Sequence, residues 1–272
     1  MKLKVLVKSL AVAALGVAGL QAQAADWSDT SISYWYGTSF KEPYVAKGAD
    51  IAKNIVSLKH VSGDKYGSNF FNVDMLMSNS VDSGATETYM VYRRLFDFGK
   101  ISGKKFEFGP VRGLGGTLGF DLNTKNDPGY GSRKRMFVFG PTFMIDVPGF
   151  LDVSLLLLSE SNAPGGIPRY SYKNHADLSL AWGIPIGSTG LVYEGFGDFI
   201  APKGTNEFGG PTYAETHLYN TIMYDVSSSV GAAKNTFKVG VGYEYWHNKF
   251  GNPSGAPGTF AHTPFVRAEY HF

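Results

Sequence analysis

The sequence contains no cysteine, which excludes disulfide bonds and thiolate metal sites. Only 18% of the residues are charged, a low share for a soluble domain, and no apolar run after residue 24 is long enough to cross a membrane as a helix. The longest such run, Leu155–Leu158, has the length of a strand. Glycine and aromatic residues are abundant instead, with 34 glycines and 15% Phe, Trp and Tyr. This combination favours a β protein.

Residues 1–24 have the pattern of a secretory signal peptide. Three lysines precede the apolar stretch 10–20, and Ala22-Gln23-Ala24 forms an A-x-A cleavage site. The alternative, an N-terminal membrane anchor, is disfavoured because the apolar stretch is too short to span a bilayer. Cleavage would leave residues 25–272, and losing the three lysines would change the formal net charge from +2 to −1. The charge therefore gives no reason to expect nucleic acid as a partner.

The rest of the chain divides into segments in which apolar and polar side chains alternate, as they do in a strand with two different faces. In residues 264–272, for example, Val266 and Tyr270 share one face, whereas Arg267 and Glu269 share the other. Twelve strands are predicted, at about 31–40, 55–61, 69–79, 86–96, 111–123, 137–145, 151–160, 175–184, 191–201, 213–226, 237–246 and 264–272.

Periodicity alone does not separate a β-sandwich from a barrel, because both give a period of two. The connections do separate them. Those after odd-numbered strands are long and rich in Gly, Pro and polar residues, and those after even-numbered strands are mostly short, which is the outer-membrane pattern. The apolar faces also end in aromatic residues, and the closing strand ends at Phe272, like the C-terminal signature of outer-membrane barrels.

We therefore predict an all-β fold, a 12-stranded antiparallel transmembrane β-barrel of the bacterial outer membrane, forming one domain over residues 25–272. Phe272 should lie at the periplasmic rim, and the closing strand should pair with the first. This location implies as partners the outer-membrane lipids and lipopolysaccharide, and during biogenesis the periplasmic chaperones and the barrel-assembly machinery. On each strand, the face that carries the charged side chains should point into the lumen, because a charge facing lipid at mid-depth costs roughly 2–4 kcal/mol.

The residues whose side chains are predicted to face the lumen form the candidate site. It holds more acidic than basic residues, which would repel anions and suit neutral hydrogen-bonding or cationic solutes. Each charge could instead belong to a structural ion pair, and each aromatic ring could either fill space or stack on a flat solute. The candidate solute-binding residues are Trp35, Asn72, Asp74, Tyr89, Arg93, Asp121, Glu194, Glu215, His217, Trp246 and Arg267.

Catalytic signatures are missing: the sequence has no G-x-S-x-G, H-E-x-x-H or P-loop motif and no His set with metal-ligand spacing. We expect no catalytic residue, cofactor or metal, and no enzyme activity. His60 and Ser62 resemble the H-x-S pairing of outer-membrane phospholipase. That family's site faces the outer leaflet, whereas His60 falls at the periplasmic end of its predicted strand, so a histidine at the rim is the favoured interpretation.

Several short motifs, spread over the mature chain in one order, carry a family resemblance. They include Tyr34-Trp35-Tyr36-Gly37, Phe40-Lys41-Glu42-Pro43, residues 60–71, residues 89–93, residues 108–112, Gly140-Pro141, residues 147–150 and Pro202-Lys203-Gly204. On these motifs the chain resembles the Tsx-like (nucleoside-specific channel-forming) outer-membrane proteins. The resemblance implies a monomeric twelve-stranded barrel with a narrow lumen of aromatic and ionisable residues that passes nucleosides passively.

The predicted function is that of an outer-membrane channel for passive, selective uptake of small solutes, with nucleosides or similar flat neutral molecules as the suspected class. The alternative is a barrel with a structural or surface-recognition role and no specific transport.

Overall fold

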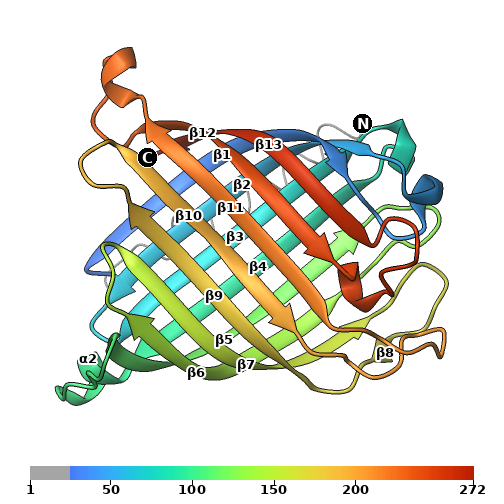
Figure 1. The fold of residues 1–272 in the computed structure, drawn as a ribbon, viewed down its shortest axis with the longest axis horizontal. Coiled ribbons are helices and arrows are strands. Elements are labelled where there is room, and N and C mark those ends of the chain that lie inside the picture. The colour runs from blue at the N-terminus through green and yellow to red at the C-terminus, as the bar shows by residue number, and fades with distance from the viewer. Residues whose placement is uncertain (1–24) are drawn as a thin grey trace.

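A computed structural model describes residues 25–272, so the predicted signal peptide lies outside the described residues. The chain forms a closed antiparallel barrel in which each long strand pairs with its neighbours in the sequence (Figure 1). The first and last strands, β1 (Trp27–Phe40) and β13 (Phe260–His271), pair with each other and complete the wall. The predicted fold is therefore confirmed.

The wall contains twelve long strands among the described residues. The other ten are β2 (Ile51–Asp64), β3 (Gly67–Ser78), β4 (Thr86–Asp97), β5 (Val111–Lys125), β6 (Arg135–Ile145), β7 (Phe150–Asn162), β9 (His175–Pro185), β10 (Leu191–Ile200), β11 (Glu215–Asp225) and β12 (Phe237–His247). A two-residue strand, β8 (Tyr170–Ser171), pairs only with the end of β7.

Each predicted strand matches one observed strand, with differences at the ends. The closing strand begins at Phe260 rather than Pro264, because Phe260–Thr263 already pairs with β12. β1 and β2 are also longer than predicted. The link between β4 and β5 contains a short helix, α2 (Phe98–Ser102), capped by the Asp97 side chain, which accepts a hydrogen bond from the Lys100 backbone N–H. No helix in residues 25–272 is both long and apolar enough to cross a membrane.

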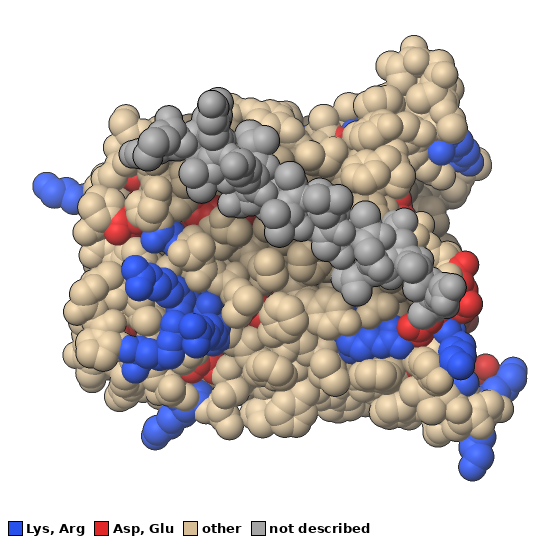
Figure 2. Space-filling model, turned by 180° about the vertical axis from the view of Figure 1, so that it is seen from behind, with Lys and Arg blue, Asp and Glu red and all other residues tan. Residues whose placement is uncertain are grey.

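Large apolar side chains point outward around the wall. Phe137 is 62% exposed, Val241 60% and Phe139 56%, and each occupies the parity opposite the buried positions of its strand. On the face seen in Figure 2, the lysines and arginines lie mostly towards the two ends, and much of the surface between them is uncharged. A closed barrel satisfies its own backbone hydrogen bonds, so such a band can face lipid. The protein is a barrel of the bacterial outer membrane.

The six connections after odd-numbered members of the twelve long strands, among them 41–50 and 248–259, meet at one end of the barrel, on the right in Figure 1. By the outer-membrane rule this end is extracellular. The start of β1 and the end of β13 lie at the other, periplasmic, end, where the Phe272 backbone N–H donates to the carbonyl of Thr30 at 3.0 Å. Helix α2 lies at that end as well.

Candidate functional site

The lumen is the candidate site, because the polar parity of the strands turns inward. All eleven residues named from the sequence occupy inward positions: Trp35, Asn72, Asp74, Tyr89, Arg93, Asp121, Glu194, Glu215, His217, Trp246 and Arg267. The alternating burial of the strands and the contacts described below establish their direction. That they bind a solute stays a prediction.

One ion pair crosses the lumen in its periplasmic half. The Lys59 ammonium on β2 lies 4.0 Å from Glu194 on β10, and these strands stand on opposite sides of the barrel in the strand order. The same ammonium lies 3.2 Å from Glu269, which also contacts Arg267 Nη2 at 2.5 Å. Arg267 in turn donates to the Tyr219 hydroxyl at 2.7 Å. These five residues form the lower belt, and they narrow the bore at this level.

A second group of polar contacts lies on the β4–β5 wall. Arg93 Nη1 donates to the Asp121 carboxylate at 2.5 Å, and the Tyr89 hydroxyl donates to the same carboxylate at 2.9 Å. The Lys134 ammonium, which comes from the connection before β6, donates to the Tyr89 hydroxyl at 3.2 Å. Burial alone would lower the pKa of Lys134, but nearby acids and Tyr89 raise it well above its usual value. Lys134 therefore carries its positive charge inside the barrel.

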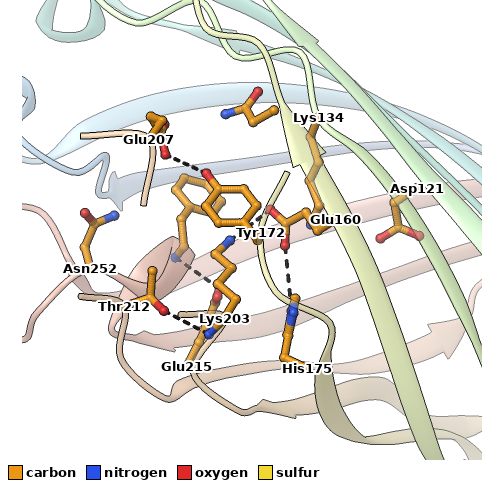
Figure 3. A network of polar contacts seen from close by, with 12 residues as sticks. Asp121, Lys134, Glu160, Tyr172, His175, Lys203, Glu207, Thr212, Glu215 and Asn252 are labelled. Atoms are coloured by element: carbon orange, nitrogen blue, oxygen red, sulfur yellow. Dashed lines mark hydrogen bonds and ion pairs between the residues drawn. The ribbon is translucent and has the colours of Figure 1, made fainter. Parts of the chain in front are cut away.

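The extracellular half of the lumen contains the network drawn in Figure 3. Lys203 donates to Glu160 at 2.8 Å, and His175 Nε2 lies 3.8 Å from the other oxygen of the same carboxylate. The Lys203 ammonium also lies 4.2 Å from the centre of the Tyr172 ring, whose hydroxyl donates to Glu207 at 2.7 Å. Because Lys203 and Tyr172 belong to connections, this network ties two extracellular loops to the inner wall of β7.

A second network, the Glu42 cluster, occupies another part of the same end. The Glu42 carboxylate lies 2.5 Å from the ammonium of Lys53, 3.3 Å from that of Lys249 and 3.7 Å from that of Lys125. All four side chains are almost fully buried. Burial alone would raise the pKa of Glu42, but the three ammonium groups outweigh it and hold the pKa far below its ordinary value. Glu42 is therefore ionised and joins the 41–50 and 248–259 loops to the wall.

These networks correct the predicted charge of the lumen. The sequence predicts more acids than bases in the lumen, but it does not predict that five lysines also enter the lumen. Two lie on strand ends beyond the predicted bounds, and three come from connections that fold inward: Lys53, Lys125, Lys134, Lys203 and Lys249. The extracellular half therefore contains mixed charge, and a simple repulsion of anions does not follow.

Most lumenal aromatic rings are packed against one another. Trp35 is 6% exposed, lies 4.8 Å from Phe265 and 5.5 Å from Tyr219 between ring centres, and donates from Nε1 to the Ser57 hydroxyl at 3.1 Å. Tyr219 also stacks on Phe196 at 5.5 Å. These rings form one cluster with a filling role, so Trp35 offers little free face to a solute.

Trp246 is covered on its ring faces. His217 lies parallel to it, with ring centres 3.7 Å apart, and the Lys249 ammonium lies 4.2 Å from the ring centre. Its Nε1 donates to Glu215 at 2.6 Å. The side chains of Arg93, Glu194 and Lys59 are 25%, 23% and 19% exposed. These three ionic groups are thus within reach of a solute in the lumen.

His60 and Ser62 make separate contacts. His60 Nδ1 is hydrogen-bonded to the Thr30 hydroxyl at 2.8 Å, and the Ser62 hydroxyl accepts a hydrogen bond from Asn69 at 3.3 Å. No hydrogen bond joins His60 to Ser62 in residues 25–272, and both lie towards the periplasmic end of β2. Within the same residues, no group of three or more His, Asp or Glu side chains is arranged to hold a metal ion.

No protein-family model and no curated protein sequence is similar to the chain. Solved structures with similar folds include the KdgM porin, with 10% identity, a TM-score of 0.44 and coverage of 89% of this chain and 99% of that one. The translocator domain of the autotransporter NalP from Neisseria meningitidis has 14% identity, a TM-score of 0.44 and coverage of 94% and 92%. OmpT of Vibrio cholerae has 11% identity and a TM-score of 0.39, with coverage of 93% of this chain and 99% of that one.

Proposed function

We propose that the protein is a substrate-selective channel that lets small polar solutes cross the outer membrane passively. The observation that carries the proposal is the lower belt, where Lys59 faces Glu194 across the lumen at 4.0 Å and both side chains stay partly exposed. Opposite charges on facing walls create an electric field across the lumen. This field favours solutes whose dipole can align with it and that can form hydrogen bonds with both walls. Neutral solutes with several polar groups meet both conditions.

Nucleosides are the suspected class within this group. The Tsx-like motifs support them, and so does the chemistry of the lining, because a nucleoside is neutral, dipolar and rich in hydrogen-bonding groups. The packed rings Trp35 and Trp246 argue against stacking as the main source of affinity. Recognition should therefore rest on the charged side chains that a solute can reach. Arg93, Glu194 and Lys59 are the residues expected to contact the solute.

The channel proposal is tested with purified protein in planar bilayers. We expect small single-channel steps, and we expect adenosine or thymidine at millimolar concentration to reduce the current because the solute occupies the narrow belt. If neither nucleoside changes the single-channel current, nucleosides are refuted as the solute, but the proposal that the protein is a channel still stands. No conductance at all would favour the alternative, a structural or surface-recognition barrel. The Glu42 cluster and the Glu160 network favour that alternative, because both fix loops over the extracellular opening of the barrel.

The role of the lower belt is tested by neutralising its cross-lumen pair. Lys59→Gln should shift ion selectivity towards cations, Glu194→Gln should shift it towards anions, and both should weaken nucleoside block, because each removes one pole of the transverse field. Reversal potentials in a salt gradient measure the selectivity.

The control for the lower-belt variants is the exposed pair Lys105 and Glu107, 3.4 Å apart near the periplasmic end. Lys105→Gln and Glu107→Gln remove the same charges outside the lumen and should leave selectivity and block unchanged. Lower-belt variants that behave like these controls would contradict the assignment.

A further inference from the structure

Three arginines gather on the outside of the barrel at its extracellular end. Arg133, Arg135 and Arg169, the arginine cluster, are all exposed. Arg169 donates from Nη2 to the Arg133 carbonyl and from Nη1 to the Ser161 hydroxyl, both at 3.0 Å. Ser161 is the register partner of Arg135, so the three arginines are neighbours. Partial desolvation and the positive charges of Arg135 and Arg133 lower the pKa of Arg169. An arginine nevertheless stays ionised in a protein.

No acidic side chain in the described part of the chain forms an ion pair with the arginine cluster. In residues 25–272 the arginines in ion pairs are Arg93, Arg94 and Arg267, and none belongs to the cluster. Three neighbouring guanidinium groups repel one another, and a folded chain usually relieves such repulsion with an acid. Here the charges are held together at the membrane rim without one, which suits an anion from outside the protein. Guanidinium groups bind phosphate in a fork geometry that ammonium groups do not offer.

An apolar hollow lies on the outer wall below the cluster. This outer groove has a volume of about 820 Å³ and crosses β6, β7, β9, β10 and β11. It exists because small outward residues such as Ala176 and Ala214 stand among bulky ones such as Phe139, Leu157 and Phe199. Its surface faces the membrane, so its natural occupant is a hydrocarbon chain.

The sheet register places the two features along the same strands. Arg135 pairs with Ser161 across β6 and β7, and four residues further along, Phe139 pairs with Leu157 at the groove. Four residues of strand span roughly 13 Å. Leu157 is also the register partner of Ala176 on β9. The cationic cluster thus stands at the level of lipid headgroups, with the groove beneath it in the outer leaflet.

We propose that the arginine cluster and the outer groove together bind one phosphorylated lipid of the outer leaflet, the class to which lipopolysaccharide belongs. The phosphate accepts hydrogen bonds from the arginines, and an acyl chain lies in the groove. This site is on the outside of the wall and is independent of solute passage through the lumen.

The experiment uses the full barrel in detergent and native mass spectrometry with bisphosphorylated lipid A as the probe. We expect wild type to retain one lipid A, and the triple variant R133Q/R135Q/R169Q to bind it roughly ten-fold more weakly or worse, because three charge-assisted contacts are lost. Dephosphorylated lipid A should show the same loss with wild type. Ala176→Phe, which fills the groove and leaves every charge in place, should also weaken binding.

The matched control is K104Q/K105Q/K234Q, which removes three exposed lysines from the periplasmic connections. It should bind lipid A like wild type, and heat-modified gel migration should show that every variant is folded. The proposal is overturned if the arginine variant binds lipid A like the control, or if wild type binds the dephosphorylated lipid equally well. It is also overturned if inorganic pyrophosphate binds through the arginines while Ala176→Phe leaves lipid A affinity unchanged, since the site would then take a free anion.

Discussion

Glu42→Gln is expected to destabilise the folded barrel by roughly 3–5 kcal/mol, the usual result of removing one partner from a buried ion pair. Glu42 is 6% exposed, and without its charge the buried ammonium groups of Lys53 and Lys249 lose their main carboxylate partner. The midpoint of urea unfolding in detergent measures the change. Single-channel recordings should in addition become noisier, because the 41–50 and 248–259 loops lose their shared anchor.

The control for Glu42→Gln lies in the same loop. Asp50 pairs with Lys41 at 2.7 Å, but its side chain is 62% exposed, and such surface pairs contribute about 0–1 kcal/mol. Asp50→Asn should therefore leave the midpoint nearly unchanged. Equal urea midpoints for Glu42→Gln and Asp50→Asn would mean that the Glu42 cluster does not stabilise the extracellular end of the barrel.

The Glu42 cluster also determines how the stability of the extracellular loops depends on pH. The pKa of Glu42 lies far below its ordinary value of 4.5, so the stability that Glu42 contributes is fully present above pH 4.5. It is lost only as the pH falls from there towards the depressed folded-state pKa, because the unfolded chain then takes up the proton first. The channel noise of wild type should therefore be the same at pH 5 and at pH 7.

Trp35→Ala is the second variant with a large expected effect, a loss of roughly 3–5 kcal/mol in the free energy of unfolding. The indole fills the space between β1, β11 and β13, and its removal leaves a cavity beside Tyr219 and Phe265. The Ser57 hydroxyl also loses the hydrogen bond that it accepts from the indole N–H. These contacts support the space-filling role for Trp35, one of the two roles that the sequence leaves open for the lumenal aromatic rings. Urea unfolding in detergent measures the loss.

Phe208→Ala serves as the comparison for Trp35→Ala, because Phe208 is 68% exposed in the loop between β10 and β11. It should cost little stability, since its ring is already largely in solvent. If Trp35→Ala unfolded at the same urea concentration as Phe208→Ala and instead abolished nucleoside block, the packing role of Trp35 would be wrong and the solute-stacking role would return.

The strands and their inward faces were predictable because a barrel wall repeats one simple rule. A side chain faces either lipid or lumen, and the difference in cost is large enough to fix the parity of β9 or β12 from sequence alone. The ends of β13 and β2 were less predictable. Phe260–Thr263 follows a stretch rich in Gly and Pro, and the pairing with β12 that makes it strand is a long-range contact with no local signal.

The lumenal chemistry was only partly predictable, for a related reason. Inward positions such as Arg93 and Glu194 follow from parity, but Lys134, Lys203 and Lys249 belong to connections, where no period exists. Their direction depends on the acids they meet, Glu160 and Glu42 among them. Parity also does not reveal that Trp246 is covered by His217 and Lys249, since that depends on how three elements meet in space.

The pairing of β1 with β13 has a consequence for how the barrel assembles. Lys59 and Glu269 are separated by 210 positions in the chain, so their contact exists only once the last strand has met the first. Until then the sheet has two open edges, which can recruit other strands, and the Lys59 ammonium lacks its nearer carboxylate. Contacts this distant in sequence form slowly. Closure of the seam is therefore the late event of biogenesis, and the intermediate that awaits it is an open sheet that needs its edges held apart from those of other chains.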